Sequence, residues 1–319
     1  MSAFRYFLGV DGGQSSTTAL IGDENGRVLG YGRDGPCNHI SGPEKRAHFV
    51  RVIGGCVRAA ALAGGLPEDH RQFHAACLGF SGGPEDKRRL VEALFSVERL
   101  EVTTDALIAL VGATAGRPGV VVIAGTGSIA FGRNAQGVTA RAGGWGYAFG
   151  DEGGGFDLSR QALRAILRAE EGWGPPTALR KKFLAAGGAD SANELLHLFY
   201  TADFPRPRIA AFSKLVDEAA REGDAVAREL LFQAAQQLAL LAAAVRDQLF
   251  TEGELVAVVH IGGVWKSDLL RERFGGLVEL RPGNRAGPPL LGPAAGALLE
   301  AYRLGGLAVT LSDVPETEK

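Results

Sequence analysis

The sequence predicts an α/β protein of two domains, and three observations lead to this prediction. The chain has 319 residues, which is more than one hydrophobic core usually supports. Short apolar runs typical of strands alternate with segments of helical periodicity, which is the pattern of α/β folds. A strand, a glycine-rich turn and a second strand occur near residue 11 and again near residue 125, which indicates a weak internal duplication.

The individual elements are marked by Gly, Asn and Asp residues between the apolar runs. In the first part we expect strands at 7–10, 17–22 and 27–33, a helix over 45–64, a strand at 75–80, a helix from 85 and a strand ending near 103–105. In the second part we expect strands at 120–124 and from 129, helices between 158 and 250, a strand at 255–261 and a closing helix at 293–302. We expect the first domain to comprise 1–107 and 292–319, and the second to comprise 108–291 with a helical insertion.

Composition excludes several classes of function. Charged residues make up 22% of the chain and the net charge is −2, so no long-range attraction to nucleic acid or to an anionic membrane is expected. The longest apolar helix candidate, 230–250, contains Arg246 and Asp247, which favours a core helix over a membrane span. The three cysteines have no metal-binding spacing, which favours free buried thiols. With no signal-peptide pattern at the start, we expect a cytoplasmic protein.

The glycine-rich stretch 143–155 is the most informative segment of the chain. Glycine lets a ligand approach the main chain closely, and Trp145, Tyr147 and Phe149 are suited to line a pocket. Asp151 and Glu152 are acceptors for hydroxyl groups. This chemistry suits a sugar, while the alternative interpretation is a tight surface turn with two solvated acids.

Three glycine-rich turns, at 11–16, 125–128 and 262–267, each follow an apolar strand. Such turns present backbone N–H groups that bind phosphate oxygens, so together they predict a nucleotide site. Neither GxxxxGK[ST] nor a strand-linked GxGxxG is present, which excludes the P-loop and dinucleotide-binding classes. Nearby hydroxyl groups add further donors: Ser15, Ser16, Thr17, Thr126 and Ser128.

Two acids stand at the ends of predicted strands, where the ligands of α/β sheets bind. Asp11 is a candidate to hold Mg²⁺ through water, and its alternative role is to form an Asx turn. Asp105 is a candidate general base for an attacking hydroxyl group, and its alternative role is to cap the following helix.

In order, these motifs resemble the BadF/BadG/BcrA/BcrD ATPases of the sugar kinase/Hsp70/actin superfamily, and within them the N-acetylglucosamine kinases. The resemblance covers residues 7–302 and is most specific in GGWGYAFGDEG together with IGGVWKS. The other matching segments are VDGGQSSTTA, TTDA and IAGTGS. The resemblance implies an actin-like ATPase fold of two ribonuclease H-like domains with a nucleotide cleft between them. It also implies ATP and Mg²⁺ as cofactors and the phosphorylation of an amino sugar, N-acetylglucosamine, at its 6-hydroxyl. A homodimer is compatible with it.

The resemblance also implies roles for individual residues. Asp105 falls on the catalytic base, and Asp11 is the metal candidate. The implied sugar contacts are Asn38, His39, Ser128, Gly144, Trp145, Gly146 and Asp151. The implied ATP contacts are Gly12, Gly13, Ser15, Ser16, Thr17, Thr126, Gly127, Ala210, Gly262, Gly263 and Ser267.

The sequence departs from the family pattern at two positions near the implied sugar pocket. Ile40 replaces an expected aromatic residue, and Ile129 replaces an expected polar residue. Glucosamine or another hexose therefore stays open as the substrate, as do N-acetylmannosamine and N-acetylmuramic acid. An alternative of a different class is an ATP-driven activator of a 2-hydroxyacyl-CoA dehydratase. That class holds an iron–sulfur cluster on its own cysteines, and the positions of Cys37, Cys56 and Cys77 do not match such a pattern.

Overall fold

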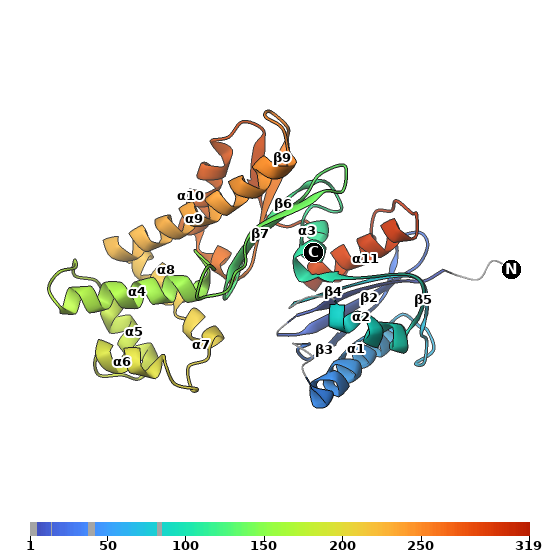
Figure 1. Cartoon of the computed structure of the whole chain (residues 1–319), viewed down its shortest axis with the longest axis horizontal. Coiled ribbons are helices and arrows are strands. Elements are labelled where there is room, and N and C mark those ends of the chain that lie inside the picture. The colour runs from blue at the N-terminus through green and yellow to red at the C-terminus, as the bar shows by residue number, and fades with distance from the viewer. Residues whose placement is uncertain (1–4, 14, 38–41, 82–84) are drawn as a thin grey trace. The chain divides into compact units, whose positions relative to one another are not determined.

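The computed structural model describes residues 5–13, 15–37, 42–81 and 85–319 (Figure 1). The chain divides into two compact units. Unit 1 comprises residues 1–117 and 289–319, and unit 2 comprises residues 118–288. The first segment of unit 1 thus extends beyond residue 107, where the sequence prediction placed the domain boundary.

Unit 1 is built around one five-stranded sheet in the order β3-β2-β1-β4-β5. Its strands β1, β2 and β3 pair antiparallel, whereas β1, β4 and β5 are parallel. The strands are β1 (Phe7–Gly12), β2 (Thr17–Gly22), β3 (Val28–Asp34), β4 (Gln72–Phe80) and β5 (Ser96–Thr104). The helices are α1 (Pro43–Ala63), α2 (Glu85–Leu94), α3 (Asp105–Ala113) and α11 (Pro293–Leu304).

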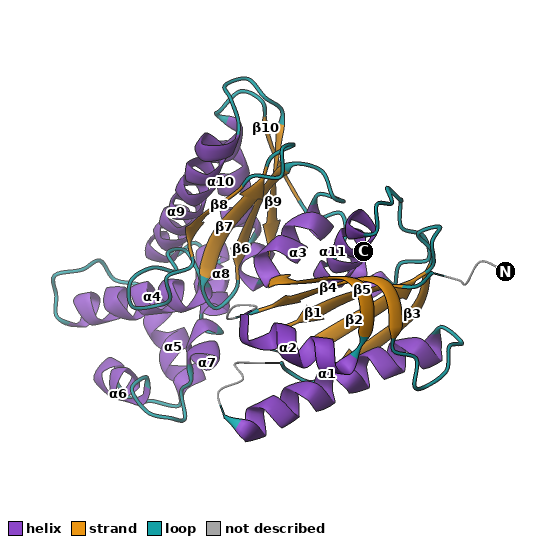
Figure 2. Cartoon of the chain, turned by 45° about the vertical axis from the view of Figure 1, so that its right-hand side comes forward, coloured by secondary structure: helices purple, strands orange, loops and turns teal. Residues whose placement is uncertain are grey.

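Helices cover both faces of this sheet (Figure 2). On one face, Leu8 and Val10 pack with buried residues of α1 and α2. On the opposite face, Phe7 and Leu20 pack with Ile108 of α3 and with the apolar side of α11. This alternation follows the two-residue repeat of a strand. Because α3 packs closely against α11, the unit boundary lies beyond α3 and not within it.

Small residues allow the close approach of α3 to α11. A Cβ atom at Gly296 of α11 would collide with the carbonyl oxygen of Ile108 and the backbone nitrogen of Gly112. The last residues of the chain return to this helix pair. The Glu318 carboxylate accepts hydrogen bonds from the N–H groups of Ala294 (3.0 Å) and Ala295 (3.2 Å). It therefore caps the N-terminus of α11, where the helix dipole favours a negative charge.

Unit 2 repeats the topology of unit 1. Its sheet order is β10-β9-β6-β7-β8, again with antiparallel pairing through the first three strands of the unit and parallel pairing through the others. The strands are β6 (Gly119–Ala124), β7 (Ser128–Arg133), β8 (Thr139–Gly143), β9 (Val256–Ile261) and β10 (Asn284–Gly287). The duplication expected from the two strand–turn–strand patterns is therefore confirmed, and each unit has the ribonuclease H-like order of elements.

Helices fill the segment between β8 and β9, as the sequence predicts. They are α4 (Gly155–Glu170), α5 (Leu179–Gly187), α6 (Ala192–Leu198), α7 (Arg206–Ala210), α8 (Ser213–Arg221) and α9 (Ala225–Leu249). The short 3₁₀ helix Gly263–Lys266 and α10 (Asp268–Glu279) follow β9. Helix α9 packs against β7, β8 and α10, and one apolar core joins these elements. In the part of the chain that the structure describes, every helix is too short or too polar to cross a membrane.

Candidate active site

In unit 1, the candidate residues gather where the parallel strands end. Asp11 lies at the end of β1, opposite Gly79 of β4. Asp105 directly follows β5, and Ser81 directly follows β4. Because β1, β4 and β5 are neighbouring parallel strands, their carboxyl ends lie along one edge of the sheet. The sequence prediction that Asp11 and Asp105 stand at strand ends is confirmed.

The carboxylate of Asp105 is held on both oxygens. Oδ1 accepts the N–H of Ala106 at 2.9 Å, and Oδ2 accepts the hydroxyl of Ser81 at 2.8 Å. The N-cap of α3 is Thr104, whose side chain accepts the N–H of Leu107. The capping role that was the alternative for Asp105 is therefore wrong, because the preceding threonine performs it. The Asp105 carboxylate is partly buried and does not cap the helix.

Asp11 is an acid in an environment that disfavours its charge. Burial raises its pKa to about 7, and the negative charges of Glu318 and Asp105 add to this effect. Such a site fits a cation, which would offset the gathered negative charge. Within the described residues, no group of three His, Cys, Asp or Glu side chains is arranged to hold a metal ion. A single carboxylate still fits Mg²⁺, which keeps most of its waters and binds substrate phosphates.

The turn after β1 is partly committed to internal hydrogen bonds. The Gly13 N–H donates to the Ser16 carbonyl at 3.0 Å, and the Thr17 hydroxyl donates to the Gly35 carbonyl at 2.9 Å. Thr17 is fully buried, so its geometry favours a structural role over the expected contact with ATP. Ser15 is exposed and Ser16 is partly buried. Gly12 is buried, and a side chain there would meet the ring of Phe80.

Two predicted sugar contacts, Asn38 and His39, lie outside the described residues, as does Ile40. The cysteine prediction is confirmed, since Cys37, Cys56 and Cys77 are buried thiols that form no disulfide bond.

In unit 2, the turn after β6 meets the glycine-rich loop 143–155. Ser128 donates its N–H to Asp151 Oδ1 at 3.3 Å and its hydroxyl to the Glu152 carbonyl at 2.6 Å. Its own carbonyl accepts the N–H of Gly144 at 3.0 Å. A Cβ atom at Gly127 would meet the Asp151 carboxylate, so a side chain at this position would displace that carboxylate. The structure thus brings together four predicted residues from two distant segments.

Backbone strain accompanies this arrangement. Asp151 has a φ of +64°, which is uncommon for a residue with a side chain. Gly144 and Gly146 also have positive φ values, which glycine adopts without strain. The loop therefore turns tightly and directs the Asp151 carboxylate toward the turn at Gly127. Strained positions of this kind gather at functional sites.

The aromatic side chains of this loop are more exposed than the sequence interpretation suggests. Trp145 is 66% exposed and Phe149 is 88% exposed. The guanidinium group of Arg141 lies 4.5 Å from the ring centre of Trp145, and that of Arg206 lies 5.0 Å from that of Tyr147. These cation–π contacts hold two of the three rings at the surface of unit 2.

The predicted adenosine segment borders a cavity of about 120 Å³ in unit 2. The Ser267 hydroxyl donates to Asp217 Oδ1 at 2.5 Å and accepts the Leu270 N–H as the N-cap of α10. The carbonyl oxygens of Ala210 and Gly125 both lie close to Gly155, and Gly262 packs against the end of β6. The segments at Gly125, Ala210 and Gly262, all expected around a nucleotide, therefore lie close together. The cavity lining is Leu158, Ser213, Lys214, Asp217, Glu218, Leu231, Gly263, Val264, Lys266 and Ser267.

Sequence reasoning missed some residues of this lining. Lys266 lies inside the IGGVWKS motif and was available as a signal. Lys214 and Asp217 lie on α8, far from every quoted motif, and their place beside Ser267 follows only from the packing of α8.

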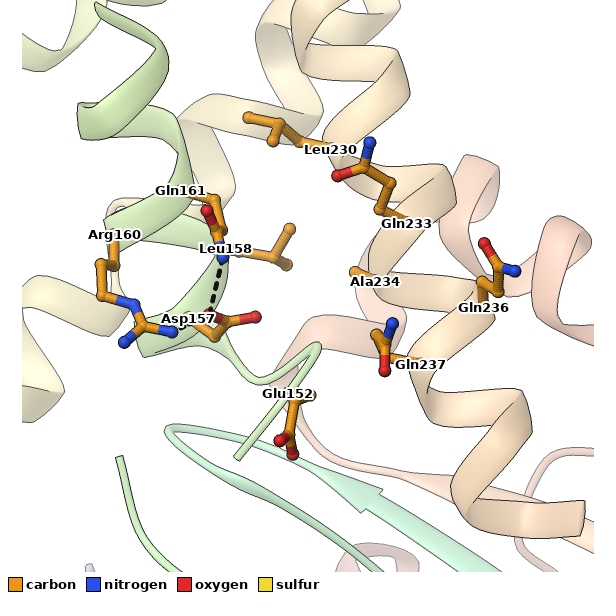
Figure 3. A pocket seen from close by; sticks show the side chains of 10 residues that line it. All are labelled: Glu152, Asp157, Leu158, Arg160, Gln161, Leu230, Gln233, Ala234, Gln236 and Gln237. Atoms are coloured by element: carbon orange, nitrogen blue, oxygen red, sulfur yellow. Dashed lines mark hydrogen bonds and ion pairs between the residues drawn. The ribbon is translucent and has the colours of Figure 1, made fainter. Parts of the chain in front are cut away.

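A second cavity in unit 2, of about 290 Å³, lies between α4 and α9 (Figure 3). Asp157 anchors one wall, because its carboxylate accepts from Gly153 N–H, from Arg160 at 2.7 Å and from Gln161 at 3.4 Å. Three glutamines of α9 form the opposite wall: Gln233, Gln236 and Gln237. Glu152 borders this cavity, so the loop 143–155 separates it from the turn at Ser128.

Two ribonuclease H-like sheets with glycine-rich turns at their strand ends, and with acids at the strand ends of unit 1, define an ATPase of the actin-like fold. The chain belongs to the BadF/BadG/BcrA/BcrD ATPase family, whose match spans residues 8–301.

Relatives with assigned activities are similar over most of the chain. The N-acetylmuramic acid/N-acetylglucosamine kinase of Clostridium acetobutylicum is 33% identical over 265 residues, covering 82% of this chain and 85% of the relative. The N-acetyl-D-glucosamine kinase of Dictyostelium discoideum is 29% identical over 323 residues, covering 92% and 97%. A crystal structure from Chromobacterium violaceum, described as that of a candidate N-acetylglucosamine kinase, superposes with a TM-score of 0.74 at 29% identity, covering 92% of this chain and 98% of that one.

Proposed function

We propose that the protein transfers the γ-phosphoryl group of ATP to the 6-hydroxyl of an amino sugar, with N-acetylglucosamine as the substrate. Family membership and the kinase relatives identify the chain as a sugar kinase that uses ATP. The observation that carries the proposal is the Asp105 carboxylate, which stands at the end of β5 and is oriented by two hydrogen bonds.

Asp105 acts as the general base in this proposal. Its carboxylate orients the attacking hydroxyl group and takes its proton as the bond to phosphorus forms. A positioned base of this kind contributes about 10²- to 10⁴-fold to the rate. Asp151, fixed by the Ser128 N–H, accepts from a sugar hydroxyl, and the main chain at Gly144 and Gly146 contributes close contacts. Asn38 and His39 complete the proposed sugar contacts.

The proposed ATP contacts come from the glycine-rich turns. The main chain at Gly12, Thr126 and Gly127 is available for phosphate oxygens, and the cavity beside Gly263 and Ser267 is available for the adenosine part. Asp11 is the residue that would hold Mg²⁺ through water. When bound, Mg²⁺ supplies positive charge that offsets the charge on the transferring phosphoryl group. The residues of the chain contribute orientation and fixed donors.

Ile129 lies beside Gly144, one of the proposed sugar contacts. Ile129 of β7 is partly buried, and its side chain fills the space that a Cβ atom at Gly144 would occupy. An apolar side chain discriminates weakly between related sugars, whereas a buried polar group left unpaired discriminates strongly. N-Acetylmuramic acid, glucosamine and glucose therefore belong in the same experiment.

The test is an ADP-release assay with Mg·ATP and each of these sugars, run with Asp105→Ala and a matched control. The control is Asp69→Ala, which removes an exposed carboxylate in the same unit. We expect turnover with an amino sugar, unchanged in Asp69→Ala and reduced by at least about 10²-fold in Asp105→Ala. Turnover of Asp105→Ala at the wild-type rate would remove Asp105 from the mechanism. Wild-type ADP release that does not depend on any sugar would contradict the kinase assignment.

A further inference from the structure

A residue that no motif points to, Ser81, lies directly beside the proposed base, and a second, Lys87, contacts Ser81. Ser81 follows the last residue of β4, and its hydroxyl donates to Asp105 Oδ2 at 2.8 Å. The other oxygen of Asp105 accepts the N–H of Ala106. An ionised carboxylate offers about four lone-pair sites, so these two bonds fix its orientation and still leave sites for a substrate hydroxyl.

Lys87 is hydrogen-bonded to the main chain of Ser81. It is the third residue of α2 and its side chain is only 2% exposed. Its Nζ donates to the Ser81 carbonyl at 2.6 Å and lies 5.3 Å from the ring centre of Phe80. Phe80 is the residue before Ser81, so the lysine holds the chain at the point where β4 ends.

A buried lysine needs compensation, because removing an ammonium group from water is costly. Burial lowers the pKa of Lys87, while its electrostatic interactions with Cys37, Asp105 and Asp86 oppose that shift. The proposed base is thus one of the charges that stabilise the lysine in place. Lys87 thus differs from a surface lysine in three respects: it is buried, its ammonium group makes a short hydrogen bond to a carbonyl, and an acid lies nearby.

We propose that Ser81 and Lys87 are positioning residues that hold the catalytic base of the kinase in its reactive orientation. Ser81 acts on the Asp105 carboxylate directly, and Lys87 acts by fixing the main chain at Ser81. This inference rests on the proposed function of Asp105. Because the rate of a bound reaction falls steeply when a reacting group is misplaced, loss of either support lowers turnover without weakening substrate binding.

The first test separates positioning from folding. In Ser81→Ala we expect kcat to fall about 10- to 100-fold, with KM for the sugar and the dissociation constant of ATP each within about twofold of wild type. Ser81→Thr keeps a hydroxyl group and is expected to restore most of the rate. The matched control is Ser191→Ala, which removes a serine that caps α6 in unit 2 and leaves kcat unchanged. A Ser81→Ala enzyme with wild-type kcat would overturn the proposal.

The second test asks whether Ser81 acts through Asp105. In an Asp105→Asn background, residual turnover is expected to change less than about twofold when Ser81→Ala is added, since the two residues form one interacting unit. An equal further loss in that background would show a structural effect that does not depend on the base and would contradict the proposal. Lys87→Met is expected to lower kcat as Ser81→Ala does, with no further loss when the two are combined. If the losses of kcat from Lys87→Met and Ser81→Ala were fully additive, Lys87 would not act through Ser81.

The outcomes also separate this inference from the proposed function. If Asp105→Asn keeps wild-type turnover, the base assignment itself fails. If Asp105→Asn is inactive and Ser81→Ala is fully active, only the positioning inference fails.

Discussion

Asp11 is expected to destabilise the folded protein at neutral pH, and its replacement by asparagine is expected to stabilise it. Burial and the charges of Glu318 and Asp105 raise the pKa of Asp11 from 3.8 to about 7. The folded state therefore binds this proton more tightly than the unfolded state does. Stability from this group is fully present below pH ~4 and is lost as the pH rises through about 7.

The size of the effect follows from the difference between the two pKa values. A difference of about three pH units, at about 1.4 kcal/mol per unit, gives an upper limit of about 4 kcal/mol at pH 8. Asparagine has no charge to lose, so Asp11→Asn avoids this penalty. Its melting temperature is expected to exceed that of wild type by up to roughly 10 °C at pH 8, with the difference disappearing near pH 4.

In the assay, calorimetry measures the thermal unfolding of both proteins at a series of pH values from 4 to 8, without nucleotide or metal. Asp69→Asn, at an exposed carboxylate of the same unit, is the control and is expected to track wild type at every pH. The same Asp11→Asn protein is expected to lose kinase activity. A difference between Asp11→Asn and wild type that does not change with pH would refute the reasoning.

Three further predictions concern separate parts of the molecule. Gly127→Ala would bring a methyl group against the Asp151 carboxylate, and we expect sugar affinity measured by calorimetry to fall at least tenfold. Gly137→Ala, at an exposed turn glycine whose positive φ a side chain would strain, controls for loss of stability. Ser267→Ala removes the N-cap of α10 and the bond to Asp217, so we expect a loss of about 1–2 kcal/mol in the free energy of unfolding and a higher KM for ATP. Burial raises the pKa of Cys37 and of Cys56 to about 12, so neither thiol should react with a maleimide at pH 8 in the native state. Rapid formation of a maleimide adduct at either cysteine, detected by mass spectrometry, would contradict their burial.

Much of the fold could be predicted because its central strands are apolar and their turns are rich in glycine. The segment that became β1 is apolar from Phe7 to Val10 apart from one glycine, the segment that became β6 is largely β-branched, and each ends in a turn that the sequence marks clearly. The strands β8 and β10 were not predicted. Their sequences, TARAG and NRAG, contain no apolar run, and both lie at the edges of the unit 2 sheet, where one partner strand suffices.

The candidate site could be predicted only where a residue acts from a recognisable segment. Asp105 and Asp151 became candidates from the sequence because each lies in a motif with a distinctive neighbourhood. Ser81 and Lys87 were not candidates from the sequence. Ser81 is 24 positions from Asp105, to which it is hydrogen-bonded, and the contact of Lys87 with Ser81 depends on how α2 packs against the sheet. Likewise, no signal in the sequence indicated that the Thr17 hydroxyl donates to a carbonyl 18 residues away, and its expected contact with ATP stays a prediction.

The position of the transferred phosphate tests the central claim most directly. We would incubate the enzyme with Mg·ATP and N-acetylglucosamine and examine the product by phosphorus–proton correlation NMR. We expect a single new phosphate coupled to the two protons on C6, absent when Asp105→Ala replaces the wild-type enzyme. A phosphate coupled to the anomeric proton, or inorganic phosphate as the sole product, would contradict it.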